Sequence, residues 1–225
     1  MTHLALINPL LFSPGDRLSR EEFLDLWEQM PGLKFAELID GIVYMPSPLS
    51  IEHGSQDFDM HGWVFNYQLH TPVFQGVANA TWLMLESAPQ PDTALRLLPE
   101  FGGRTTVQDK LASGAPELVI EVCHSSRSYD LGPKLSLYQR ADVNEYIALL
   151  IKEKRVEWRV LEAGSYRLLK PDEAGVFRSK IFPGLWLDES ALWRNDAKRL
   201  IEVLNQGLHS DEHAAFLKRL GVERP

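Results

Sequence analysis

Four polar side chains stand at positions where the surrounding pattern favours hydrophobic or neutral residues. Glu37 lies in an apolar run, Asp92 follows a proline at the approach to a candidate strand, and Glu121 interrupts the run LVIEVC. Lys134 follows on the next candidate helix. A carboxylate in so apolar a strand must be paired, bound to a metal or exposed at a sheet edge, because burying it alone costs several kcal/mol.

Carboxylates that converge on one point form a hard oxygen site of the kind that binds Mg²⁺ or Mn²⁺. Such an ion activates water and neutralises the charge that builds on a phosphate during hydrolysis. A nearby lysine can hold or deprotonate that water. The order Pro-Asp, strand acid and lysine is therefore typical of a metal-dependent phosphodiesterase.

Each of these residues also has a simpler structural interpretation. Glu37 could be an edge-strand charge that prevents aggregation, and Asp92 could be a turn residue bonded to nearby backbone. Lys134 could be a solvated helix residue. Glu121 is the strongest functional candidate, because the run around it is nearly all apolar.

The elements that must position these residues are readable in the first half of the chain. The spacing of Ser19 and Glu22 is that of a capping box, which predicts a helix over residues 20–30. Asp40-Gly41 suits a tight type I′ turn and predicts a hairpin that carries Glu37. A helix is expected over residues 50–70, with apolar positions Phe58, Trp63, Val64, Tyr67 and Leu69.

Strands and helices then alternate, which predicts a mixed α/β domain. A helix over 130–141 that starts near Pro133 would carry Lys134. Helices are expected from residue 188 onward, with Asp188 or Asp196 as caps. Residues 99–114 form one long loop-like segment. The strands are expected at 74–79, 81–86, 93–98, 117–123 and 145–151, followed by a hairpin of 154–161 with 165–169.

The composition of the 225 residues is that of a folded globular protein, with 44% hydrophobic and 24% charged residues. The net charge of -8 argues against a surface that binds nucleic acid everywhere. One cysteine, Cys123, excludes an internal disulfide and is compatible with a reducing cytosol. We find no signal-peptide pattern and no stretch near the ~20 apolar residues of a membrane span, so a cytoplasmic location is expected.

In order along the chain, six landmarks resemble the Uma-two family of restriction endonuclease-like proteins, which have the PD-(D/E)XK nuclease fold. The resemblance covers roughly residues 19–193. The landmarks are AELIDG at 36–41, EHG at 52–54, PD at 91–92, PELVIEV at 116–122, the Asp130, Lys134 and Tyr138 series, and FPGL at 182–185.

The resemblance implies a central mixed sheet flanked by helices and a reaction that hydrolyses DNA phosphodiester bonds. Asp92 and Glu121 would be ligands of Mg²⁺ or Mn²⁺, Glu37 a further acidic member of the site, and Lys134 the catalytic lysine. The chain would divide into an N-terminal extension (1–18), a restriction-endonuclease-like domain (19–193) and a C-terminal helical tail (194–225).

Two departures from the superfamily pattern bear on activity. The position two residues after the strand acid, where the superfamily has a lysine, holds Cys123, so catalysis would depend on Lys134 reaching the site. Arg96 stands inside a strand that is usually apolar, where it could contact phosphate or face solvent. Arg127 is the preferred phosphate contact, and His53 could position substrate or water or serve as a structural group.

The acidic charge further predicts that a homodimer or a partner supplies the surface that binds duplex DNA. A second hypothesis is a catalytically inactive nuclease-fold protein that acts as a nucleic-acid-binding or assembly module. Cys123 in place of the lysine motivates it.

Overall fold

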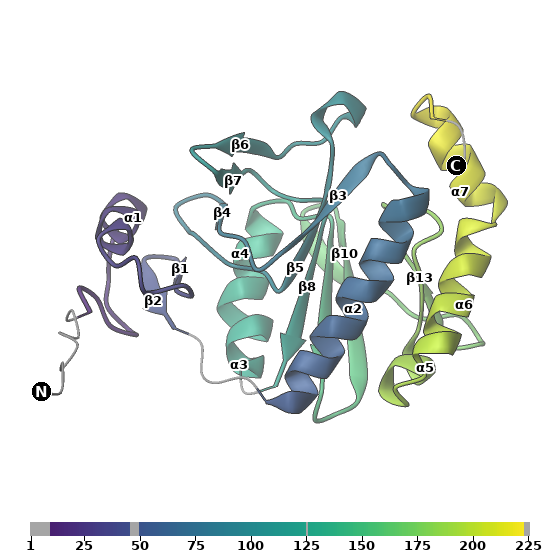
Figure 1. Cartoon of the computed structure of the whole chain (residues 1–225), viewed down its shortest axis with the longest axis horizontal. Coiled ribbons are helices and arrows are strands. Elements are labelled where there is room, and N and C mark those ends of the chain that lie inside the picture. Colours follow the sequence, from purple (N-terminus) through teal and green to yellow (C-terminus); the bar gives the residue numbers. More distant parts are fainter. Residues whose placement is uncertain (1–9, 46–49, 125, 223–225) are drawn as a thin grey trace, which may run out of the picture.

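The computed structural model describes residues 10–45, 50–124 and 126–222. Its centre is a six-stranded sheet in the order β11-β10-β9-β8-β5-β3 (Figure 1). β8 and β9 pair in parallel and the other neighbours are antiparallel. The mixed α+β architecture predicted from the sequence is therefore confirmed. The strands are β3 (Phe74–Ala78), β5 (Thr93–Leu97), β8 (Leu118–Cys123), β9 (Glu145–Leu150), β10 (Arg155–Glu162) and β11 (Ser165–Leu168).

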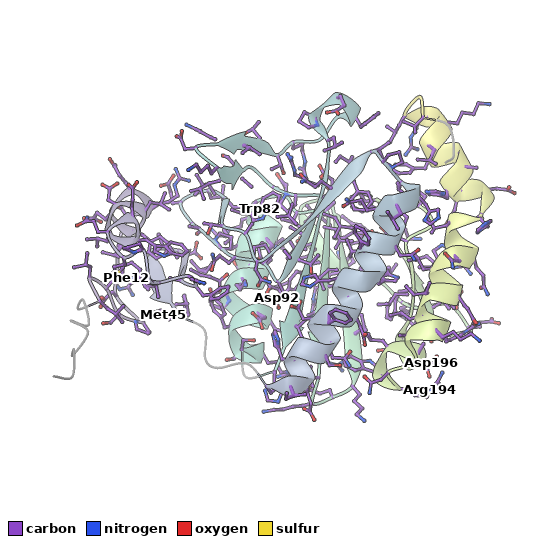
Figure 2. All side chains as sticks on the ribbon, in the orientation of Figure 1. Phe12, Met45, Trp82, Asp92, Arg194 and Asp196 are labelled. Carbon is purple, nitrogen blue, oxygen red and sulfur yellow. The ribbon has the colours of Figure 1, made fainter. Side chains whose placement is uncertain are left out.

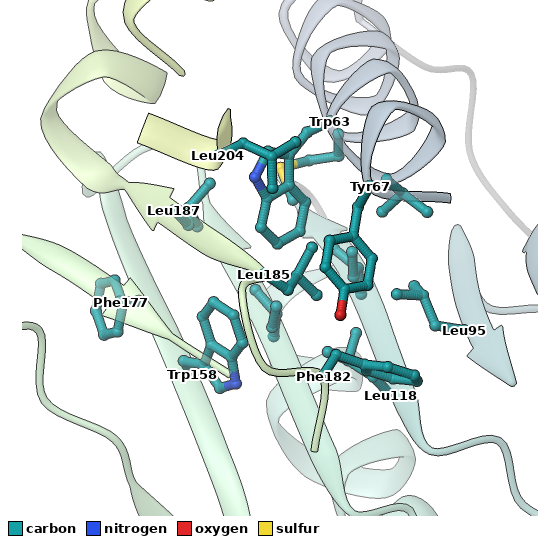
Figure 3. Close-up of a cluster of buried hydrophobic side chains, with 14 of the residues drawn as sticks. Trp63, Tyr67, Leu95, Leu118, Trp158, Phe177, Phe182, Leu185, Leu187 and Leu204 are labelled. Atoms are coloured by element: carbon teal, nitrogen blue, oxygen red, sulfur yellow. The ribbon is translucent and has the colours of Figure 1, made fainter. Parts of the chain in front are cut away.

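The two parallel strands are buried along their whole length, because both faces of the sheet are covered. One face packs against α2 (Ile51–His70), which crosses in front of the sheet in Figure 1. Figure 3 shows Trp63 and Tyr67 of α2 lying close to Leu185 and Phe182 in this core. Leu118, Ile120 and Val122 of β8 belong to the same cluster.

The other face of the sheet is covered by the helical segment that follows β8. This segment runs through α3 (Arg127–Tyr129), the π-helical turn η2 (Asp130–Lys134) and α4 (Leu135–Arg140). Val119 and Cys123 pack there against Leu137 and Tyr138. Since side chains alternate along a strand, Glu121 points to this same face.

An N-terminal module lies to one side of the sheet and has a hydrophobic cluster of its own (Figure 1). It consists of α1 (Arg20–Glu28) and a hairpin of β1 (Glu37–Ile39) and β2 (Ile42–Tyr44). Both bonds of the predicted capping box are present at Ser19. Asp40 and Gly41 have positive φ angles of 50° and 77°, as a type I′ turn requires.

The segment 99–114 is not one long loop, so that expectation was wrong. It contains the short helix η1 (Pro99–Phe101) and a hairpin of β6 (Thr106–Gln108) and β7 (Leu111–Ser113). With β4 (Trp82–Leu83), the remnant of the expected strand 81–86, these form a small sheet in the order β4-β7-β6. The turn residues Asp109 and Lys110 both have positive φ angles without a glycine, which left no hairpin signal in the sequence.

The helical segment after β8 begins at Arg127, earlier than the start predicted near Pro133. Proline has no N–H, so regular α-helical bonding cannot run through this position. The backbone instead widens into a π turn, in which the Leu135 N–H bonds the Asp130 carbonyl five residues back. The turn leaves both Asp130 and Lys134 buried.

The C-terminal helices pack against the main core. Asp188 caps α5 (Glu189–Trp193) and Asp196 caps α6 (Ala197–Leu208), as predicted. The last helix is α7 (Asp211–Arg219), and β12 (Val176–Arg178) pairs with β13 (Trp186–Asp188). The cluster that contains Trp63 and Tyr67 also includes five side chains of α6 and α7, namely Leu200, Leu204, Leu208, Phe216 and Leu217.

Among the described residues, no helix combines the length and the apolar character that crossing a membrane requires.

Candidate active site

The ammonium group of Lys134 lies between two carboxylates. Its Nζ is 2.7 Å from Oε1 of Glu121 and 2.9 Å from Oε1 of Glu37. The π turn aims this side chain inward, and Lys134 is only 2% exposed. Although burial lowers the pKa of Lys134, Glu121 and Glu37 raise it more, so its pKa lies well above the ordinary lysine value. The ammonium therefore keeps its charge.

Glu121 lies in the middle of β8, opposite Ala148 of β9, and is 2% exposed. Burial raises its pKa well above the ordinary value, while the Lys134 ammonium opposes that rise. The hydroxyl of Tyr138 donates to Oε1 of Glu121 at 2.7 Å, the same atom that Lys134 contacts. Two donors thus fix one oxygen of this carboxylate.

Asp92 comes directly before β5. Thr93 pairs with Ile120 in the antiparallel ladder, so the next step of the register sets Asp92 beside Glu121. Its Oδ2 accepts the Val122 N–H at 2.7 Å. Burial raises the pKa of Asp92 to about 7, against the lowering effect of Lys134. In Figure 2, Asp92 lies between the N-terminal module and α2.

Glu37 reaches this cluster from the hairpin of the N-terminal module. Its Oε1 accepts the Gln90 N–H at 2.6 Å, and its Oε2 accepts the Tyr129 hydroxyl at 3.2 Å. The Tyr129 ring stacks on Tyr44 of β2 with a centroid distance of 4.0 Å. These contacts fix the module against the helical segment that carries Lys134.

Helix α2 borders the cluster on its other side. Nε2 of His53 is 3.9 Å from Oδ2 of Asp92, and burial lowers the pKa of His53. Within the described part of the chain, the buried Nδ1 of His53 has no hydrogen-bond partner. About two helical turns further, Nε2 of His61 lies 3.5 Å from Oδ1 of Asp57 and 3.3 Å from the carbonyl of Asp92. Two helix residues thus lie beside Asp92.

The donor set suits a divalent cation that keeps most of its ligands outside the protein. No group of three or more histidine, cysteine or acidic side chains arranged for a metal occurs among residues 10–45, 50–124 and 126–222. Mg²⁺ is commonly held by one or two carboxylates, with waters and substrate phosphates completing the octahedron. Asp92 and Glu121 are the two carboxylates that would hold such an ion. Burial raises the pKa of both carboxylates, and a cation would relieve that cost.

The two arginines predicted to contact substrate are each held by another side chain. Arg96 is four residues along the strand from Asp92, about 13 Å in extended backbone, and it donates to Oε1 of Gln75. Arg127 begins α3 and lies 3.0 Å from Glu153. The structure brings together Glu37, Asp92, Glu121 and Lys134, with His53 at the edge.

Sequence reasoning assigned no contact with the candidate site to three neighbours of the cluster, although Asp130 and Tyr138 stand among the family landmarks. Tyr129 holds Glu37, Tyr138 holds Glu121, and the buried carboxylate of Asp130 adds negative charge near Lys134. A signal for Tyr138 exists, since it lies one helical turn after Lys134. The π turn removes such a signal for Tyr129, because helical spacing fails across it.

Cys123 occupies the position where the superfamily pattern has a lysine. Its thiol is buried, and burial raises the thiol pKa. It packs with the apolar residues on this face of the sheet. The ammonium that contacts Glu121 therefore comes from η2 and not from the strand.

The comparisons with known proteins agree with this architecture. A crystal structure of a protein described as a "putative nuclease belonging to DUF820", from Anabaena variabilis ATCC 29413, aligns with a TM-score of 0.62 and 14% identity. The alignment covers 79% of this chain and 98% of that chain, and at this identity it shows the shared fold. No curated protein matches. The model of the Uma2 family, described as "Putative restriction endonuclease", matches residues 20–190 and supports a nuclease-like function. The chain therefore belongs to the Uma2 family.

Proposed function

We propose that this protein is a metal-dependent endonuclease that hydrolyses phosphodiester bonds in DNA. The observation that carries the proposal is the buried Lys134 ammonium, held by Glu121 and Glu37 beside Asp92. Keeping an ammonium and several carboxylates out of water is costly, so such a buried cluster points to chemistry. Family membership supports the same class of reaction.

Asp92 and Glu121 would hold Mg²⁺ or Mn²⁺. When bound, the ion would supply Lewis-acid activation of water and neutralise charge on the phosphate. The Val122 N–H holds one oxygen of Asp92, and Tyr138 and Lys134 hold one oxygen of Glu121. The carboxylates are thus oriented before any ligand arrives, which lowers the reorganisation needed on binding.

Lys134 would orient the attacking water. An ammonium has three N–H donors, and the two carboxylates account for two of them. The third can hold a water or a phosphate oxygen. Glu37 keeps the ammonium charged and in place from the opposite side, so its role is to position Lys134.

The test is a calorimetric titration with Mg²⁺ and Mn²⁺ of the wild type and Glu121→Gln, with plasmid nicking followed in the same buffers. We expect metal binding and nicking in the wild type and neither in the variant. Glu145→Gln is a matched control, because Glu145 is also fully buried but hydrogen-bonds Ser179, Lys180 and Trp158, away from Lys134. Absence of metal binding in the wild type would refute the proposed metal site.

Heat stability gives a second readout of the same site. A ligand that binds the folded state alone raises the melting temperature by mass action. We therefore expect millimolar Mg²⁺ or Mn²⁺ to raise the melting temperature of the wild type and not that of Glu121→Gln. Equal shifts in both proteins would locate the metal elsewhere.

The second candidate function is a catalytically inactive module that binds nucleic acid or assembles with a partner. The observation in its favour is Cys123, a buried thiol at the position of the superfamily lysine. Under this function, Glu121→Gln would leave DNA or partner binding intact and the wild type would not nick. Nicking that depends on Glu121 would exclude it.

A further inference from the structure

The outer face of α2 carries a continuous apolar stripe. The exposed fractions of Ile51, Phe58, Phe65 and Leu69 are 90%, 77%, 59% and 57%. At 100° per residue these side chains fall within one narrow sector of the helix. The stripe is about 27 Å long at 1.5 Å per residue. Exposed apolar surface of this extent marks an interaction site.

The stripe also contains small residues in a regular place. Gly54 and Gly62 lie in the same sector, and a methyl group added to either would meet no atom within 4 Å. Ser55 is exposed beside them. Glycine is unfavourable inside a helix, so two of them on an exposed face leave hollows between the large side chains.

This face is complementary to itself when two copies of α2 run antiparallel. Pairing residues whose numbers sum to 120 sets Phe58 against Gly62 and Phe65 against Ser55. The same register sets Ile51 against Leu69. Every phenylalanine of one copy thus meets a small residue of the other, and the aliphatic ends meet each other.

Charge complementarity favours the same antiparallel arrangement. Glu52 lies in the first turn of α2 and His70 lies in its last turn. An antiparallel copy in this register sets Glu52 of one helix beside His70 of the other, and it opposes the two helix dipoles. The helix contains neither lysine nor arginine, which argues against a nucleic-acid or anionic lipid surface as the occupant.

We propose that the outer face of α2 is the interface of a two-fold symmetric dimer, with a second copy of this chain as its occupant. The sequence predicts a homodimer without locating its interface, and the structure directs attention to α2. The inference does not depend on the proposed nuclease activity. A C2 interface uses the same patch on both copies, as this register requires.

Sedimentation velocity at micromolar concentration tests the interface. We expect a dimer for the wild type and a monomer for the double variant Phe58→Glu with Phe65→Glu, with an unchanged circular dichroism spectrum. Leu168→Glu is the matched control, since Leu168 is 57% exposed on β11 and should leave the dimer intact. A monomeric wild type, or a double variant that still dimerises, would overturn the proposal.

A size change at the hollow separates specific pairing from general stickiness. Gly62→Leu adds apolar surface and helix propensity, yet it fills the space that receives Phe58. We expect this variant to be at least tenfold weaker as a dimer and no less heat-stable as a monomer. A stronger dimer would contradict the proposed register.

Cross-linking tests the register itself. Cysteines at both Phe58 and Gly62 should give a disulfide-linked dimer on oxidation, because 58 and 62 sum to 120. Phe58→Cys alone is the control, since two copies of residue 58 would meet in a parallel pairing. The native Cys123 is buried and should not contribute. Efficient cross-linking of the single variant and not of the double would refute the antiparallel arrangement.

Discussion

The ammonium group of Lys134 pairs with the carboxylates of Glu121 and Glu37, which the fold withdraws from water. Removing one member of a buried ion pair costs about 3–5 kcal/mol, because the other charge stays buried. We expect Lys134→Met to lower the free energy of unfolding by about this amount at pH 8. Urea denaturation of both proteins measures it.

The loss of unfolding free energy in Lys134→Met should become smaller as the pH falls. Burial raises the folded-state pKa of Glu121, so a proton on that carboxyl stabilises the folded state relative to the unfolded one. Adding Glu121→Gln to Lys134→Met should restore part of the stability at pH 8, since it removes the unpaired charge. Equal destabilisation at pH 5 and pH 8 would contradict this account.

Glu145 offers a pH test away from the candidate site. Burial raises its pKa from 4.5 to about 7, although Ser179, Lys180 and Trp158 donate to it. Stability from this group is complete below pH 4.5 and is lost as the pH rises toward 7, a change of about 3 kcal/mol. The wild type should therefore lose more stability than Glu145→Gln between pH 4.5 and pH 7.5. Parallel urea-denaturation curves across that range would refute the shift.

At the residue scale, the sequence located the acids by their mismatch with apolar surroundings. Glu121 stands out because a buried strand offers it no water. The second contact of Lys134, with Glu37, is not encoded in any local pattern, because 97 positions separate the two residues and a different module supplies one of them. Tertiary packing decides such contacts.

At the element scale, the approach of α6 to β13 depends on a glycine. A Cβ at Gly207 would lie 2.2 Å from the Gly184 carbonyl oxygen and 2.8 Å from the Trp186 ring. We expect Gly207→Ala to destabilise the protein by about 2 kcal/mol through overpacking. Gly32→Ala, in the turn after α1, is the control and should stabilise by up to about 1 kcal/mol, because its methyl group meets no atom within 4 Å. Thermal denaturation of the two variants compares them.

Elements with strong local signals were predicted well. The capping box at Ser19 and the Asp40-Gly41 turn formed as expected, because each satisfies its backbone locally. The hairpin around Asp109 and Lys110 was missed, because both residues adopt positive φ angles although neither is a glycine. The sequence placed Phe58 and Leu69 among the apolar positions of α2 without assigning them to a face, because periodicity identifies apolar positions without revealing what covers them.

At the scale of the whole molecule, the C-terminal helices belong to the core that supports α2. α6 and α7 contribute five large buried side chains to it, and each is worth about 1.5–3 kcal/mol. Together they contribute about as much free energy as the net 5–15 kcal/mol by which a typical domain is stable. We expect a chain ending at residue 194 to lose cooperative thermal unfolding and to bind a hydrophobic dye. The five residues are Leu200, Leu204, Leu208, Phe216 and Leu217.

The assembly of the site from distant parts of the chain has a consequence during protein synthesis. Glu37, Asp92, Glu121 and Lys134 come from four separate elements, and α2 is held in place by α6, near the end of the chain. A ribosome must release the chain through Lys134 before these side chains can meet, and through α6 before α2 is secured. Contacts this far apart in sequence also form slowly. A nascent polypeptide that still lacks α6 therefore has no secured site, and whatever chemistry the site performs begins only after this helix has emerged and packed.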